Sequence, residues 1–411
     1  MAAKRQRADA ADRAAMEAVR CIGDGRPAEA QGLLEQALSE EGERPDLLHA
    51  LAVVEMQLGE VGKARPHVER ALALLQGTQG EEAAQMRALF TLTLAAVAQE
   101  EDDPAGAQAA CQDVLTSRPD FAPARSTLAA ILFALGELDD GRAEMHRLSV
   151  DPRVPEEERA GARAFVEALD RWRASGEHPR AFLVAHRERY CRFFDDMARE
   201  AATKGWIAEA AVFVRAEDGT SRPRVPEGAR PYAAVRVDLV DPATGQRGLV
   251  GDQPMVVVRR GFEPLARIPV LLPWPGIPFD LCVSTQAPWD ELPVQVLLEE
   301  GDPVACVDPV IGAWYTDGFE GRFGEADRGR FHYVGDPERS RAHGATWRVD
   351  LGRARTEAVD ALVERLAALH REVPLRRVIL GRGSLPPDGP PVRPEAPPLR
   401  RPGRRPLPSS P

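Results

Sequence analysis

Residues 57–72 read QLGEVGKARPHVERAL, and an earlier segment, residues 23–38, reads GDGRPAEAQGLLEQAL. Aligning the two segments places Ala30 and Ala64 34 residues apart. A repeat of that period is typical of a helix pair that cannot bury its apolar face alone, so that neighbouring pairs stack into a superhelix with a concave surface. The front of the chain is therefore predicted to be a helical solenoid that offers a docking surface.

The same pattern continues at residues 100–115, EEDDPAGAQAACQDVL, and at residues 134–149, ALGELDDGRAEMHRLS. The longer interval before the third segment is explained by an insertion at residues 74–85, which lengthens one connection. Small residues let two helices approach closely, and they recur at Ala18, Ala52, Ala95 and Ala129 in the first helix of each pair and at Ala30, Ala64, Ala107 and Gly141 in the second.

These segments resemble tetratricopeptide repeats, and four repeats are expected over residues 11–153. The chain departs from the family pattern where bulky aromatic positions hold Ala, Leu or Glu55, and where Gly141 replaces the usual Ala. An unrelated array of helical hairpins is the alternative, and it would have the same function.

The resemblance implies that ligands lie in the concave groove, which the first helix of each repeat lines. Carried over to this sequence, the groove is mostly apolar and lacks the Lys, Arg and Asn with which co-chaperone members hold a terminal peptide carboxylate. We therefore expect a protein or peptide partner that presents an apolar or amphipathic segment. In the alternative, the protein's own bridging helix or second domain fills the groove. The expected groove residues are Val19, Ile22, His49, Val53, Met56, Leu89, Leu92, Gln99, Ser126 and Phe133.

Helical spacing continues after the repeats. Residues 156–174 place Phe165, Leu169 and Trp172 on one face, and this helix is expected to close the open end of the solenoid. Residues 181–206 are expected to form a further helix that bridges to a second domain or belongs to it.

The hydrophobic period changes from residue 207 onwards. Apolar runs that alternate or are β-branched, separated by Pro, Gly and Asp, predict strands. Near the end of the chain, residues 345–351, 355–371 and 375–381 read as strand, helix and strand. The earlier predicted strands occupy residues 208–219, 232–248, 255–260, 265–272, 279–285 and 293–300.

The fold class is therefore predicted to be α+β and multidomain. Residues 1–175 form the helical repeat domain with its capping helix, residues 176–206 the bridging helix, and residues 207–385 a mixed α+β domain for which no family is recognised. Residues 386–411 contain 11 prolines and are expected to be a disordered tail with polyproline II character. This tail is basic and could fold back on the solenoid, although a solvated extension is the simpler expectation.

Charge and composition exclude several classes of function. Residues 1–175 hold 31 acidic and 20 basic residues, which accounts for the whole net charge of −11, so nucleic acid is not an expected partner. The chain has no run of 18 apolar residues, which predicts a cytoplasmic protein without a membrane segment. Its five cysteines form no C-x-x-C pair, which argues against disulfides and against a zinc site.

The second domain contains no recognisable catalytic motif. Cys282 and Cys306 lie in apolar, strand-like contexts, where a thiol is more often a core residue than a nucleophile. No motif spacing organises the remaining candidates, and we expect no cofactor and no metal. These candidates are Asp308, Asp317, His332 and His343.

The most distinctive stretch is residues 310–334, where aromatic residues are interleaved with Gly, Asp and Arg on an expected loop. Such a segment can line a ligand pocket, serve as an interface, or plug the end of a sheet. By contrast, GRGSL at residues 381–385 is not expected to bind phosphate, because no helix follows it. The aromatic residues are Trp314, Tyr315, Phe319, Phe323, Phe331 and Tyr333.

The sequence thus predicts an interaction adaptor that works through the concave face of the solenoid. The alternative is an enzyme or a small-ligand-binding protein whose active domain is residues 207–385, with the repeats recruiting a protein substrate or regulator. Convergence of the Cys, Asp and His candidates in one cleft would favour the enzyme, and their dispersal would favour the adaptor. The sequence leaves the oligomeric state open.

Overall fold

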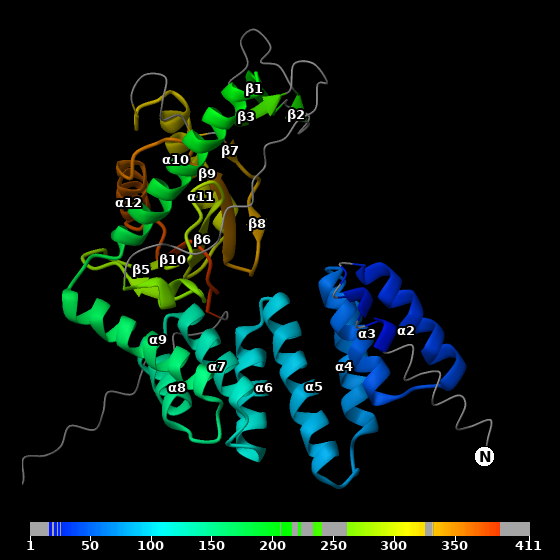
Figure 1. Ribbon diagram of the computed structural model, residues 1–411. Coiled ribbons are helices and arrows are strands. Elements are labelled where there is room, and N and C mark those ends of the chain that lie inside the picture. The colour runs from blue at the N-terminus through cyan, green and yellow to red at the C-terminus, as the bar shows by residue number, and fades with distance from the viewer. Residues whose placement is uncertain are drawn as a thin grey trace, which may run out of the picture.

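A row of antiparallel helices forms one body, and a sheet domain stands over its C-terminal half (Figure 1). The predicted fold class, a helical repeat region followed by a mixed sheet domain, is confirmed. The predicted strand at 255–260 and the tail residues 387–411 lie outside the described residues. The computed structural model describes residues 16–18, 20–22, 24, 26–205, 207–215, 221–222, 233–240, 261–324, 331 and 333–386.

The repeat region consists of paired helices that follow the helical residues 16–18 and 20–22. The helices are α2 (Pro27–Glu41), α3 (Pro45–Gln57), α4 (Val61–Leu74), α5 (Glu81–Glu100), α6 (Pro104–Ser117), α7 (Ala122–Leu135) and α8 (Leu138–Val150). Proline stands at the first or second position of α2, α3, α6 and α7, where its missing N–H leaves no helical hydrogen bond unmade.

The turn inside each of the last three repeats contains a residue with positive φ. Gly59 (φ 76°), Asp102 (φ 56°) and Gly136 (φ 84°) fill this place in the second, third and fourth repeats. Asp102 is the one residue of this set that carries a side chain, so its backbone conformation is strained. The recurrence of this turn explains why the repeat period is visible in the sequence.

Small residues bring the helices of each repeat together as predicted. Ala52, Ala64, Ala95 and Ala107 are each 0% exposed, and they belong to apolar clusters confined to the repeats. Neighbouring helices therefore pack backbone to backbone, and the solenoid has several small cores in place of one large core.

The predicted capping helix is α9 (Glu156–Ser175), and it buries Phe165, Leu169 and Trp172 as expected. These residues belong to the large apolar cluster that also contains Leu265 of the sheet domain. The cap therefore joins the solenoid to the second domain. The predicted bridging helix is α10 (Arg180–Thr203).

The sheet domain contains a seven-stranded mixed sheet with the order β4-β5-β10-β6-β9-β7, and β8 also pairs with β9. Strands β5 and β10 are parallel, and the other pairs are antiparallel. A separate three-stranded sheet has the order β2-β1-β3. The strands and the short helix η1 are β1 (Ile207–Arg215), β2 (Ser221–Arg222), β3 (Ala233–Val240), η1 (Glu263–Ala266), β4 (Leu271–Pro273), β5 (Asp280–Ser284), β6 (Leu292–Leu298), β7 (Tyr333–Val334), β8 (Glu338–Arg339), β9 (Gly344–Asp350) and β10 (Leu375–Leu380).

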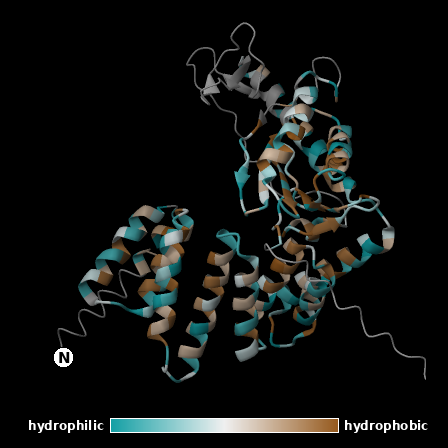
Figure 2. Cartoon of the chain, turned by 180° about the vertical axis from the view of Figure 1, so that it is seen from behind, coloured by the Kyte–Doolittle hydropathy of each residue, from teal (hydrophilic) through white to brown (hydrophobic). Residues whose placement is uncertain are grey.

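Different elements pack on the two faces of the large sheet. Helices α10, α11 (Pro303–Phe319) and α12 (Glu357–Leu369) contribute to the apolar cluster on one face, which contains Trp347 and Val294. The opposite face holds a smaller cluster that includes Cys282 and the later residue Leu385. Apolar residues gather in the middle of this domain and between the solenoid helices (Figure 2).

Three local predictions are wrong. The first half of segment 310–334 is not a loop, and Cys306 is not in a strand, because both belong to α11. Asp302 caps this helix by accepting a hydrogen bond from the Val304 amide at 3.0 Å, and Pro303 occupies its first turn. Of the predicted strand 265–272, only the end is a strand, because η1 occupies its beginning.

Candidate protein-binding face

The first helices of the second and third repeats, α3 and α5, carry most of the expected groove residues. Val53 and Met56 of α3 and Leu92 of α5 are half-buried, and Leu89 of α5 is 45% exposed. A large apolar side chain with nearly half of its surface in water is available to a partner. We call these four side chains the α3–α5 face.

His49 is fixed between α3 and α5. Its ring stacks on Phe90 with 4.2 Å between the centroids, and its Nε2 atom lies 2.8 Å from Oγ1 of Thr93. Burial lowers the pKa of His49 to about 4, so the ring is neutral near pH 7. His49 therefore holds the two helices in register and brings no charge to the α3–α5 face.

The other expected groove residues have different surroundings. Ile22 is half-buried against the apolar cluster that contains Leu47 and Leu51. Gln99 and Ser126 are exposed, and Val19 lies outside the described residues. Phe133 is 0% exposed and has no surface to offer a partner.

Phe133 explains the glycine that departs from the repeat pattern. A Cβ atom at Gly141 would lie 2.8 Å from the Phe133 ring, so only glycine leaves room for this side chain. The ring also packs on Phe165 of α9, with 4.9 Å between the centroids. Gly141 was a signal in the sequence that a large residue fills the fourth repeat.

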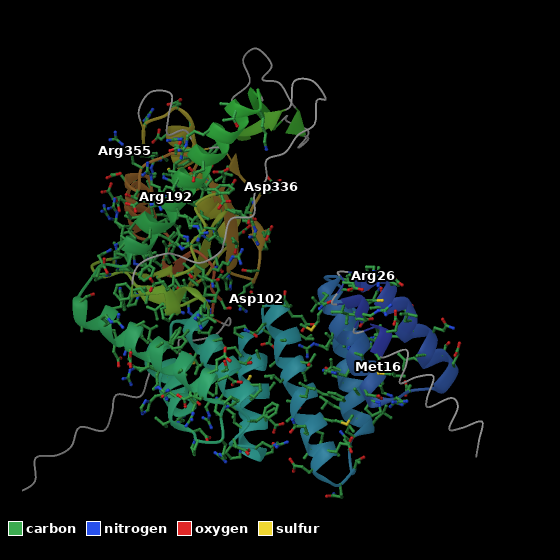
Figure 3. All side chains as sticks on the ribbon, in the orientation of Figure 1. Met16, Arg26, Asp102, Arg192, Asp336 and Arg355 are labelled. Atoms are coloured by element: carbon green, nitrogen blue, oxygen red, sulfur yellow. The ribbon has the colours of Figure 1, made fainter. Side chains whose placement is uncertain are left out.

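The sheet domain rests on the inner turns of the third and fourth repeats. Arg341 pairs with Asp102, with 3.2 Å between Nη2 and Oδ1, and Arg377 donates from Nη1 to the Leu135 carbonyl oxygen at 2.6 Å. Asp102 lies where the top of α5 meets the sheet domain (Figure 3). Asp102 thus combines a strained turn with the contact between the two domains.

The GRGSL segment, which sequence reasoning set aside, is part of this joint. The Ser384 amide donates to the Ala134 carbonyl oxygen at 3.0 Å, and Gln295 donates to the Gly381 carbonyl oxygen at 2.9 Å. A Cβ atom at Gly383 would lie 2.7 Å from Leu271. The glycines therefore serve close approach between the sheet and the end of α7, and their spacing beside a strand was the available signal.

The aromatic residues of segment 310–334 belong mainly to the core. Trp314 and Phe331 are 0% exposed with 4.6 Å between their ring centroids, and Trp314 Nε1 donates to the Ala358 carbonyl oxygen at 2.7 Å. Tyr315 is 2% exposed and Phe323 is half-buried. The side chains of Phe319 and Tyr333 lie outside the described residues.

The chemistry-bearing candidates of the second domain do not converge in the described residues. Burial raises the pKa of the Cys282 thiol to about 12, which makes it a poor nucleophile. Asp308 accepts a hydrogen bond from Trp347 Nε1 at 2.9 Å, Asp317 pairs with Arg322 at 2.8 Å, and His343 Nδ1 lies 2.8 Å from the Gly301 carbonyl oxygen. His332 lies outside the described residues.

The described residues provide neither a metal-binding cluster nor a membrane-spanning helix. No group of three or more His, Cys, Asp or Glu side chains there could hold a metal ion. No described helix has the length and apolar character needed to cross a bilayer. All five cysteines are free.

Known proteins are similar to the repeat region. The tetratricopeptide repeat family model matches residues 22–89 and 98–164. No curated protein matches the chain. A thermophilic tetratricopeptide-repeat protein of Thermus thermophilus is 20% identical, and the alignment covers 38% of this chain and 98% of that chain with a TM-score of 0.24. The pilF protein of Pseudomonas aeruginosa is 19% identical, with 48% of this chain and 90% of that chain covered and a TM-score of 0.23.

The matched segments agree with the helix pairs and with the small residues buried between them. Tetratricopeptide repeats form solenoids whose extended concave surfaces bind other proteins. Residues 22–89 and 98–164 are therefore tetratricopeptide repeats, a scaffold for protein interaction.

Proposed function

We propose that this protein is an adaptor that binds an apolar or amphipathic segment of a partner protein on the α3–α5 face. The observation that carries the proposal is the 45% exposure of Leu89 on α5, a first helix of the solenoid. Leu92 of α5 and Val53 and Met56 of α3 are half-buried, and His49 joins these two helices. Adaptable Met and branched apolar side chains supply much of the binding energy for helical or extended segments.

The position of the sheet domain supports this proposal. Its ion pair with Asp102 and its hydrogen bonds with Ala134 and Leu135 involve the end of α5 and the end of α7. The α3–α5 face consists of Leu89 and Leu92, which lie before the end of α5, and of Val53 and Met56 on α3. In this proposal residues 1–175 supply the docking surface, residues 176–206 bridge, and residues 207–385 hold the C-terminal end of the solenoid.

The dispersal of Cys282, Asp308, Asp317 and His343 supports the adaptor over an enzyme, because each side chain has a structural contact of its own. We also propose a cytoplasmic location, which five free cysteines support because reduced thiols are usual in that compartment.

The test is affinity capture with the full chain from cells that express it, followed by mass spectrometry. Leu89→Glu places a charge in the α3–α5 face and is expected to reduce partner recovery at least tenfold. Val150→Glu is the matched control, because Val150 is an apolar residue of α8 that is 59% exposed. Recovery that is equal for both variants would contradict the proposal.

A further inference from the structure

The turns that follow α3 and α5 carry acidic side chains. Glu60 follows α3, and Glu100 and Glu101 end α5. Lys63 and Arg65 pair with Glu60 and Glu101, whereas Glu100 is exposed and takes part in no ion pair with another described residue. A segment that fits this surface would therefore combine apolar side chains with positive charge.

The sequence contains such a segment in residues 387–411. Pairs of arginines at 400–401 and 404–405 stand between Leu399 and Leu407. Proline before or after each pair restricts the backbone, which lowers the conformational entropy lost when an extended segment binds. The segment thus offers both the charge and the apolar side chains.

The described chain brings this segment to the right place. Leu385 is 1% exposed beneath the sheet, and the neighbouring Ser384 amide is bonded to Ala134 in the last turn of α7. Residues 387–411 therefore start beside the end of α7, next to α5. At about 3.1 Å per residue an extended segment of this length spans roughly 75 Å, whereas adjacent packed helices are about 8–10 Å apart. Helix α3 is well within reach.

We propose that residues 387–411 bind in cis across the α3–α5 face, with their arginines beside the exposed Glu100 at the end of α5 and with Leu407 against Leu89. This inference rests on the proposed function, because it gives the same face an internal occupant that a partner must displace. Tethering supplies an effective concentration of about 1 mM for a short flexible connection. A partner must therefore bind tightly enough to compete, and the tail sets the threshold for docking.

The experiment is photo-crosslinking in the full chain with Leu407→p-benzoylphenylalanine, at a protein concentration low enough to keep the reaction within one molecule. Mass spectrometry is expected to map the adducts to peptides that contain residues 45–57 and 81–100. Changing the four arginines at 400–401 and 404–405 to Ser is expected to lower these adducts at least fivefold.

Variants in the solenoid test where Leu407 binds. Leu89→Glu is expected to lower the same adducts at least fivefold, and Val150→Glu is expected to leave them unchanged. Glu100→Arg alone is expected to lower the crosslinked adducts. Adding Arg404→Glu and Arg405→Glu to the Glu100→Arg chain is expected to restore the adducts, because the charges are then exchanged. Adducts on the sheet domain, adducts spread along the whole chain, or adducts only between molecules would overturn the proposal. This readout needs no partner, so it can fail while partner capture succeeds, and the reverse also holds.

Discussion

Leu169→Ala tests whether the last solenoid helix and the sheet domain share one core. Leu169 of α9 is 0% exposed and belongs to the same apolar cluster as Leu265 of η1 and Phe182 of α10. Truncating a buried leucine to alanine costs about 3 kcal/mol, because apolar contacts are lost and a cavity remains. With a urea dependence of about 3 kcal/mol per molar for a domain of this size, the midpoint should fall by about 1 M.

Tryptophan fluorescence reads this effect selectively. The six tryptophans lie at Trp172 or later in the sequence, so their fluorescence reports α9 and the second domain. Far-ultraviolet circular dichroism reports the helices of the whole chain. Leu169→Ala is expected to lower the fluorescence midpoint and the later part of the dichroism transition together.

The matched control is Leu34→Ala, which truncates another leucine with 0% exposure in a cluster confined to the first repeats. It should lower the dichroism midpoint and leave the fluorescence midpoint within error, because repeats are coupled mainly to their neighbours. A fluorescence midpoint that is unchanged in Leu169→Ala, or equally lowered by both variants, would refute the shared but local core.

Two further predictions concern stability. Gly141→Ala should destabilise the protein by about 1 kcal/mol in thermal unfolding, because overpacking against Phe133 exceeds the gain in helix propensity. Gly32→Ala should stabilise the protein, because no atom lies within 4 Å of its new Cβ. The test is that the two variants change the unfolding free energy in opposite directions. Burial lowers the pKa of His186 in the native state to about 4. Between about pH 6.5 and pH 4 the proton therefore binds mainly to the unfolded state, and the free energy of unfolding decreases as the pH is lowered. Relative to His186→Gln, the natural chain should lose about 2 kcal/mol between pH 6.5 and pH 5 in urea titrations, and parallel pH profiles would contradict this account.

The sequence predicted the parts of the fold that near neighbours encode. Repeat spacing located Ala52 and Ala64 between helices, and helical periodicity located Phe165 and Leu169 on the buried side of α9. Alternating apolar residues located most strands of the second domain. These features recur within one element or one helix pair, so a single sequence is sufficient to predict them.

The remaining features depend on contacts between distant segments. Ser384 and Ala134 meet only when the sheet domain rests on the solenoid, so the glycines of residues 381–385 could indicate a close approach without indicating its partner. The glycines of segment 310–334 suggested a loop, yet the capped start of α11 and its buried Trp314 stabilise a helix. Phe133 was expected in the groove because its spacing matches the repeat pattern, and only the space at Gly141 shows why it is buried.

The most direct test of the central claim is hydrogen–deuterium exchange of the full chain with and without the partner recovered by capture. The account predicts that the partner slows exchange in peptides that contain residues 45–57 and 81–100, and that Leu89→Glu abolishes this protection. Protection confined to residues 261–386, with unchanged exchange in α3 and α5, would contradict the assignment of docking to the solenoid.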